Sequence, residues 1–224
     1  MNINVAIDGP AGAGKSSIAK AVAKSTGYIY ADTGALYRSV AYYTINKGIS
    51  PSDKAAVVSL LDGLEIKLEY IDGQQRVIVA GEDVSDKIRT PEVSMGASVV
   101  SAIPEVREFL FDLQKKIASE NNIIMDGRDI GTVVLPEAQL KIFLTASAEE
   151  RARRRFAELK ETEGITFENI LEDIIRRDEN DMNRTVSPLK QADDAILVDT
   201  TKMTIDEVIA LLEKMIRETE ERVG

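Results

Sequence analysis

The sequence contains neither cysteine nor histidine. Without cysteine, the chain can form no disulfide and no thiolate metal site, and it has no thiol for nucleophilic catalysis. This composition suits a reducing compartment and predicts a cytoplasmic protein. Without histidine, the chain also lacks the commonest general base and the commonest ligand of transition metals. Any catalysis must therefore depend on other side chains.

Long apolar runs and a net positive charge are also missing. No run approaches the roughly 18 apolar residues that cross a bilayer, and no basic and then apolar leader precedes the first strand pattern. We therefore expect neither a membrane partner nor a secretory signal. The formal net charge of −10 argues against a nucleic-acid polymer as partner. With 224 residues, 44% of them hydrophobic, the chain is long enough for one large α/β domain or a core with a small insert.

The first chemical signal is a glycine-rich segment that follows the apolar strand pattern of residues 3–7. Residues 9–16 match G-x-x-x-x-G-K-[ST] at every fixed position, and a helical pattern follows. Glycines let such a loop turn its N–H groups toward a phosphate, the lysine adds positive charge, and the helix dipole favours the same anion. A turn that binds nothing is the alternative, but the flanking strand and helix favour a nucleoside triphosphate site. The predicted phosphate-binding residues are Gly9, Pro10, Ala11, Gly12, Ala13, Gly14, Lys15, Ser16 and Ser17.

A second signal comes from the strand pattern of residues 122–125, which ends in Asp126 as a Walker-B strand ends in an acid. The pattern is common by itself, but beside a phosphate loop it predicts a Mg²⁺ site formed by Ser16 and Asp126, the latter directly or through water. Arg128 and Asp129 follow at the carboxyl end of the same strand, where open α/β sheets bind ligands. Phosphoryl transfer fits a chain without histidine, because its catalysis is mostly positioning and charge stabilisation.

Another strand pattern, residues 28–30, leads into a helix that Asp32 or Thr33 can cap and that runs toward Gly48. Arg38 lies in the first turns of this helix. A lone arginine is usually a solvated surface charge. Here its place just past a strand end, in a chain with a phosphate loop, favours ligand binding.

Residues 49–102 show a different secondary-structure pattern from the rest of the chain. Two β-prone runs, 64–70 and 76–79, flank Asp72-Gly73, which predicts a β-hairpin within an otherwise strand–helix–strand chain. We therefore expect an inserted subdomain at 49–102, joined by loops through 81–91 to a helix at 93–102. The core would comprise residues 1–48 and 103–224.

A longer helix begins at Pro104 and is expected to reach about residue 119. Arg107 lies one turn into it. Spacing alone makes Arg107 either a surface charge near Glu105 and Glu108 or a functional residue. The sequence pattern does not decide between these two roles.

Arginines are concentrated in residues 147–165, which predict a helix that Ser147 caps and Gly164 ends. Arg151, Arg154 and Arg155 share one helix face. A run of charge is usually a solvated surface. Four arginines within five residues of an acidic protein instead favour phosphate contacts and a helical lid that closes over the transferred group.

The last third of the chain continues the alternation of helices and strands. A helix at 167–181 brings Arg177, Asp181 and Arg184 onto one face, either as a binding set or as an internal ion-pair ladder. A strand at 195–198 and an amphipathic helix at 204–221 follow. Together the patterns predict an α/β fold with a central parallel five-stranded sheet flanked by helices.

Six motifs, in order across nearly the whole chain, resemble those of the bacterial cytidylate kinase family: GPAGAGKSS, DTGALYRSVAYY, PEVRE, DGRDIGTVV, EERARRR and RRDENDMNR. Segment 49–102 is similar to the enlarged nucleoside-monophosphate domain that separates this family from adenylate kinases. The resemblance implies a P-loop kinase core and Mg²⁺-dependent transfer of a phosphoryl group from ATP to CMP or dCMP. The products would be ADP and CDP or dCDP, and we expect a monomeric enzyme.

The resemblance also implies roles for single residues. Residues 9–17 would hold the ATP phosphates, and Lys15, Arg128, Arg151, Arg154 and Arg155 would be catalytic. Cytosine offers a donor at N4 beside acceptors at N3 and O2, so its site needs both an acceptor and a donor, and uracil would be rejected. The CMP-binding residues would be Thr33 and Arg38 at the phosphate, Ser98, Arg107 and Asp129 at the base, Arg128 and Arg184 at the acceptor phosphate, and Arg177 with Asp181 at the ribose.

Two departures from the family pattern leave alternatives. Some members have glycine directly after the loop lysine, whereas this chain has Ser16 and Ser17, so either hydroxyl can be the metal ligand; Ser16 fits the general motif. Thr33 stands where other members have serine, and its hydroxyl is kept.

Three rival functions stay open at this point. One is a kinase for another monophosphate, such as UMP or AMP. A GTPase-type switch would need a guanine-reading N-K-x-D, which the chain lacks. An assembly protein driven by ATP would hydrolyse ATP without dependence on a monophosphate.

Overall fold

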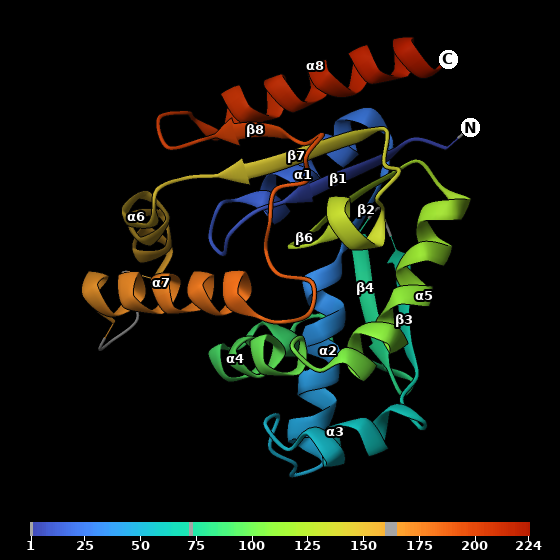
Figure 1. The fold of residues 1–224 in the computed structure, drawn as a ribbon, viewed down its shortest axis with the longest axis vertical. Coiled ribbons are helices and arrows are strands. Elements are labelled where there is room, and N and C mark those ends of the chain that lie inside the picture. The colour runs from blue at the N-terminus through green and yellow to red at the C-terminus, as the bar shows by residue number, and fades with distance from the viewer. Residues whose placement is uncertain (1, 72–73, 160–164) are drawn as a thin grey trace. The chain divides into compact units, whose positions relative to one another are not determined.

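The computed structural model describes residues 2–71, 74–159 and 165–224 (Figure 1). The chain forms two compact units, one of Met1–Tyr30 with Asn121–Gly224 and the other of Ala31–Glu120. The second unit therefore takes in more of the chain than the insert expected at residues 49–102. The role of that insert as a nucleotide-binding subdomain stays a prediction.

A five-stranded sheet organises the first unit, in the order β2-β6-β1-β7-β8. Its strands are β1 (Asn4–Asp8), β2 (Ile29–Asp32), β6 (Ile123–Gly127), β7 (Leu140–Thr145) and β8 (Ile196–Asp199). The central strand β1 runs parallel to β6 on one side and to β7 on the other, and β7 runs parallel to β8. The expected parallel sheet is confirmed. In this register Asp8 lies opposite Gly127, so the loops that follow β1 and β6 begin side by side.

Four α-helices belong to the part of this unit that the structure describes: α1 (Lys15–Thr26), α6 (Ala148–Leu159), α7 (Phe167–Asn183) and α8 (Ile205–Val223). Helix α1 ends at Gly27, whose φ of 76° is left-handed, and Thr204 caps α8 together with Glu207. The predicted end of the arginine helix at Gly164 lies outside the described residues. Nowhere in residues 2–71, 74–159 and 165–224 does a helix combine the length and apolarity needed to cross a bilayer.

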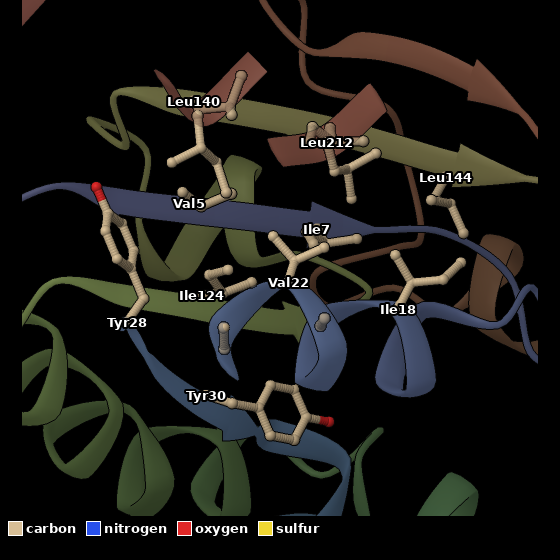
Figure 2. Packing of buried hydrophobic residues seen from close by; sticks show 14 of the residues in the cluster. Val5, Ile7, Ile18, Val22, Tyr28, Tyr30, Ile124, Leu140, Leu144 and Leu212 are labelled. Atoms are coloured by element: carbon tan, nitrogen blue, oxygen red, sulfur yellow. The ribbon is translucent and has the colours of Figure 1, made fainter. Parts of the chain in front are cut away.

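The core of the first unit lies between the sheet and the helices α1 and α8 (Figure 2). Val5, Ile7 and Ile124 come from the central strands, Val22 comes from α1, and Leu212 comes from α8. All five side chains are fully buried. This packing fixes β1 and the start of α1, and therefore both ends of the glycine-rich loop that joins them.

The second unit pairs helices with a small antiparallel sheet. Asp32 caps α2 (Thr33–Asn46) by accepting from Ala35 N, so of the two predicted candidates Asp32, and not Thr33, is the cap. Strands β3 (Ile66–Ile71) and β4 (Gln74–Val79) confirm the antiparallel pair of the expected hairpin, while its turn at Asp72-Gly73 lies outside the described residues. The remaining helices are α3 (Lys54–Leu61), η1 (Lys87–Arg89), α4 (Pro91–Val100) and α5 (Pro104–Glu120).

A third strand, β5 (Glu82–Asp83), stands where the sequence predicts only loop. Ala80 and Gly81 both have positive φ, at 49° and 82°, which turns the chain tightly enough for β5 to pair with β4. Alanine rarely adopts this conformation, so the turn could not be predicted from the residue types alone.

Candidate functional site

The glycine-rich loop joins β1 to α1 and encloses the side chain of Lys15. Lys15 Nζ donates to the carbonyl oxygens of Gly9 at 2.8 Å and of Pro10 at 2.7 Å. A Cβ on Gly9 would lie 1.9 Å from the carbonyl oxygen of Leu144, so only glycine fits there. Burial, followed by the charge of Arg128, lowers the pKa of Lys15 well below its usual value, against the opposing charge of Asp126. An anionic ligand would add a charged partner to the two carbonyl acceptors of this buried cation.

Ser16 and Asp126 lie together, as the metal-site prediction requires. Ser16 Oγ donates to Asp126 Oδ2 at 2.8 Å, and the Tyr30 hydroxyl donates to Asp126 Oδ1 at 2.8 Å. Ser17 is exposed. Hydroxyl and carboxylate oxygens suit Mg²⁺, which usually takes its other ligands from water and substrate phosphates. Across the described residues, no three histidine, cysteine, aspartate or glutamate side chains are grouped to hold a metal ion. Ser16 and Asp126 offer one hydroxyl and one carboxylate oxygen of the kind that Mg²⁺ binds.

Asp8, at the end of β1, ties the glycine-rich loop to the segment after β6. Its two carboxylate oxygens accept hydrogen bonds from Ile130 N at 2.8 Å and Gly131 N at 2.7 Å, at the start of a single π-helical turn, η2 (Ile130–Val134). Asp8 is buried. This link fixes the backbone directly after Asp129, and so helps to hold the end of β6 beside the loop.

Asp8→Asn is expected to change the pH dependence of stability. Burial raises the pKa of Asp8 from 3.8 to about 6, Asp129 acts in the same direction, and the two N–H donors and Lys15 oppose it. A raised pKa means that the group's contribution is complete below pH 3.8 and is lost as the pH rises through 6. From about pH 4 to pH 7, the free energy of unfolding of the natural protein should fall by about 2 kcal/mol relative to Asp8→Asn. Urea titrations of both proteins across this range measure the difference.

Asp83→Asn is the matched control for this experiment. Hydrogen bonds from Ser85 hold the pKa of Asp83 at about 2. The contribution of Asp83 is therefore complete above its unfolded pKa and should stay flat from about pH 5 to pH 7. A constant difference between the natural protein and Asp8→Asn over the whole range would contradict the assignment.

Arg128, half-buried at the end of β6, forms an ion pair with the buried Asp181 of helix α7. Arg128 Nε donates to Asp181 Oδ2 at 2.8 Å, and Arg128 Nη1 donates to the carbonyl oxygen of Gly127 at 3.2 Å. Burial opposes the charge on Arg128, but the nearby Asp181 carboxylate raises its pKa overall. The guanidinium is thus charged and held by Asp181. In the sequence, Arg128 follows closely after the metal candidate Asp126.

Arg184 and Asp129 form a second pair close to the first. Arg184 Nη2 lies 3.4 Å from Asp129 Oδ1, and Arg184 Nε donates to the carbonyl oxygen of Ser187 at 2.6 Å. Both side chains are buried. Arg177, on α7, completes the predicted set in this unit. The structure therefore connects Arg128 to Asp181 and Asp129 to Arg184, as two ion pairs among the predicted binding residues.

The arginines of α6 point to different partners. Arg151 contacts the glycine-rich loop through the carbonyl oxygen of Ala11. Arg154 donates to the backbone oxygen of Thr200 at 2.7 Å, and Arg155 pairs with Glu158 at 2.8 Å and is exposed. The structure does not bring these three guanidinium groups together on a common target.

In the second unit, Arg38 forms an ion pair with Asp32, the residue that caps its own helix, α2. Arg38 Nη2 lies 2.8 Å from Asp32 Oδ2, and Arg89 Nη2 lies 3.5 Å from the same oxygen. Within the described residues, the buried Nε of Arg38 has no hydrogen-bond partner. A buried N–H without an acceptor is costly, so this donor is available to an anionic ligand. Thr33, the first residue of α2, is buried.

Ser98 and Arg107 are linked through Ser101. The Ser101 hydroxyl donates to the backbone oxygen of Ser98 at 2.9 Å, and Arg107 Nη1 donates to the backbone oxygen of Ser101 at 3.3 Å. The Arg107 guanidinium carbon also lies 5.4 Å from the ring centre of Tyr37, on α2. Arg107 is buried, so its alternative role as a surface charge is wrong.

Sequence reasoning missed three residues that organise these sites: Asp8, Asp178 and Ser101. Asp178 Oδ2 lies 2.6 Å from Arg151 Nη2, and its other oxygen accepts from Ala11 N. A signal existed for Asp8, because an acid directly before the glycine-rich loop is out of place at the end of an apolar strand. Asp178 lies within a charged helix, where spacing does not distinguish buried from exposed acids.

Comparison with known proteins gives one consistent family. Residues 5–218 match the family model described as cytidylate kinase. A cytidylate kinase from Caldicellulosiruptor bescii is 53% identical over 208 residues, which are 92% of each chain. One from Clostridium tetani is 49% identical over 220 residues, 98% of this chain and 96% of the other.

A solved structure agrees with the fold. The crystal structure of an uncharacterized protein from Eubacterium ventriosum superimposes with a TM-score of 0.55 and covers 97% of this chain and 99% of that one. At 13% identity, this likeness concerns the fold alone.

Proposed function

This chain belongs to the cytidylate kinase family, and we propose that it transfers the γ-phosphoryl group of ATP to CMP, giving ADP and CDP. One observation carries the proposal: a glycine-rich phosphate loop with a buried Lys15, whose Nζ is held by the carbonyl oxygens of Gly9 and Pro10, lies within a chain that matches the family model over residues 5–218. The same enzyme would act on dCMP, since the resemblance to the family extends to both acceptors.

The transfer would be direct and in line. An oxygen of the CMP phosphate attacks the γ-phosphorus of ATP, the new O–P bond forms as the bond to the β-phosphate oxygen breaks, and ADP leaves. No side chain needs to be phosphorylated, because the acceptor is already an anionic oxygen. Lys15 and Arg128 would stabilise the charge that develops on the transferred group.

Magnesium is the cofactor that the site fits. Ser16 and Asp126 would hold it, as neighbouring hard oxygen ligands. When bound, the ion would neutralise phosphate charge. The chain's own residues bind and orient both nucleotides: residues 9–17 hold the ATP phosphates, and the CMP-binding set begins with Arg38 and Thr33 at the phosphate and Arg177 with Asp181 at the ribose. A monomer in the cytoplasm remains the expectation.

Arg107→Ala tests the base-reading assignment. Cytosine presents acceptors at O2 and N3, and Arg107 is a buried donor anchored by Ser101, with its guanidinium over the ring of Tyr37. Removing its guanidinium should raise KM for CMP at least about tenfold and lower the preference over UMP by a similar factor, because a site that loses a polar partner discriminates poorly. Coupled ADP-release assays with CMP and UMP measure both quantities.

Lys116→Ala is the control for Arg107, since Lys116 is an exposed cation on the same helix, α5. It should leave both constants unchanged. If Arg107→Ala keeps both its affinity for CMP and its preference over UMP, Arg107 does not read the base.

A panel of nucleoside monophosphates tests the function as a whole. With ATP and Mg²⁺ present, ADP release should require CMP or dCMP and should be much slower with UMP, AMP or GMP. ATP hydrolysis that proceeds equally without any monophosphate would overturn the proposal and favour an assembly protein driven by ATP.

A further inference from the structure

Two side chains of the helices α6 and α7 hold the backbone of Ala11, in the glycine-rich loop. Arg151 Nη1, from α6, donates to the carbonyl oxygen of Ala11 at 2.8 Å. Asp178 Oδ1, from α7, accepts from the N–H of Ala11 at 3.3 Å. The two side chains are joined to each other, with Arg151 Nη2 2.6 Å from Asp178 Oδ2. The backbone donor and acceptor of one loop residue are therefore both held by a single ion pair.

This arrangement directs all three guanidinium nitrogens of Arg151 to partners within the chain. Its third nitrogen, Nε, donates to the carbonyl oxygen of Ala146 at 2.9 Å, so every nitrogen of the guanidinium has a partner within the chain. Its side chain is only 5% exposed. The position of Arg151 on a helix face with Arg154 and Arg155 suggested a phosphate contact, but its hydrogen bonds point to the loop that would hold the phosphate.

The helices also support the loop by packing. The atoms nearest to a Cβ built on Gly12 are Arg151 Cβ at 3.5 Å and Ile174 Cδ1 at 3.8 Å. Ile174 belongs to a small apolar cluster of its own between α6 and α7, in which Phe156 meets Phe167 edge to face. The helical pair is thus a packed body, and the Arg151–Asp178 pair is its polar attachment to the loop.

We propose that Arg151 and Asp178 are positioning residues for ATP. They hold the loop at Ala11 in the conformation that binds phosphate, and they couple α6 and α7 to it. Binding to a loop that is already ordered avoids the entropic cost of ordering it, so loss of the pair should weaken ATP selectively. The inference rests on the proposed function only in naming ATP as the ligand of the loop.

Asp178→Asn is the variant that tests the pair. Asparagine keeps the shape and one acceptor for Ala11 N–H but loses the charge that pairs with Arg151. We expect the dissociation constant of a non-hydrolysable ATP analogue, measured by calorimetry, to rise about tenfold, as for loss of a charge-assisted hydrogen bond. KM for ATP should rise in parallel, while the dissociation constant of CMP stays within about twofold. Asp173→Asn is the control, because Asp173 is an exposed acid on the same helix that pairs only at the surface with Arg176.

A double variant, Arg151→Met with Asp178→Leu, separates positioning from folding. Replacing a buried ion pair by apolar side chains often leaves stability unchanged. This variant should therefore melt near the natural protein and still bind the ATP analogue about tenfold more weakly. Unchanged affinity for the analogue in both variants, or equal weakening of the analogue and CMP, would overturn the inference. Direct binding of the analogue needs no phosphoryl acceptor, so failure of the CMP kinase proposal would be visible separately in the nucleotide panel.

Discussion

Lys15→Met is expected to lower kcat/KM for ATP about 10³-fold without unfolding the protein. The ammonium is buried, has its hydrogen bonds directed to Gly9 O and Pro10 O, and carries a pKa that burial and the charge of Arg128 lower. The triphosphate would be its counterion, and removal of one such preorganised donor costs about 10²- to 10³-fold in other enzymes. Steady-state kinetics with varied ATP and saturating CMP measure the loss.

The stability of Lys15→Met should move in the opposite direction. A cation whose pKa is lowered by burial is penalised in the folded state, so methionine should leave the melting temperature unchanged or raise it. Lys24→Met is the matched control, because Lys24 is an exposed lysine near the end of the same helix, and it should change neither activity nor stability. A Lys15→Met enzyme that is folded and keeps more than about a tenth of its activity would show that this charge does not stabilise the transition state.

The local features of the fold could be predicted from the sequence, because each depends on residues that are close together in the chain. Glycines at fixed spacing predicted the phosphate loop, and Gly27 ends α1 as expected. Asp32 caps α2, and the alternating apolar run of 64–70 overlaps β3 (Ile66–Ile71) of the hairpin pair. In each case the physical cause, a left-handed φ, an N-cap or a period of two, acts within a few residues.

The ion-pair partners of the buried charged residues could not be predicted from the sequence, because they depend on how elements far apart in the chain pack together. Arg151 and Arg155 are indistinguishable as positions on a helix face, yet one is buried against the loop and the other pairs at the surface with Glu158. Asp178 and Asp181 lie three residues apart on α7 and hold arginines from two different elements, Arg151 from α6 and Arg128 from the end of β6. The choice of partner is fixed by tertiary geometry, which helical spacing does not contain.

The ion-pair ladder expected as an alternative at Arg177, Asp181 and Arg184 shows the same limit. Helical spacing suggested contacts along α7, but Asp181 pairs instead with Arg128 and Arg184 pairs with Asp129, both from the segment after β6. Asp181, and Arg184 directly after α7, therefore pair with another element, although Arg176 and Asp173 do pair within the helix. This is also why Arg128 is held in a fixed orientation before any ligand binds.

Arg128→Lys should lower kcat by about 10²- to 10³-fold and also raise KM for CMP. The guanidinium uses Nε to pair with Asp181 Oδ2 at 2.8 Å and Nη1 to reach Gly127 O at 3.2 Å. Its planar fork can present the remaining N–H groups to a phosphate at the same time. Lysine has a single side-chain nitrogen, so a lysine that pairs with Asp181 has few N–H groups left to bind the substrate phosphate. Kinetics with varied CMP at saturating ATP separate kcat from KM, and the size of the loss follows from other charge-stabilising groups.

Arg176→Lys is the matched control, because Arg176 is an exposed arginine on α7 whose ion pair is with Asp173. It should behave as the natural enzyme. Asp181→Asn tests the role of the carboxylate that holds Arg128. It leaves the guanidinium of Arg128 intact but removes its charged partner, so part of the loss in kcat should also appear in this variant, although Arg128 keeps its charge. If Arg128→Lys matches the natural enzyme in both kcat and KM, a single positive charge is enough at this position. The prediction that the guanidinium of Arg128 binds Asp181 with one edge and the acceptor phosphate with another would then be wrong.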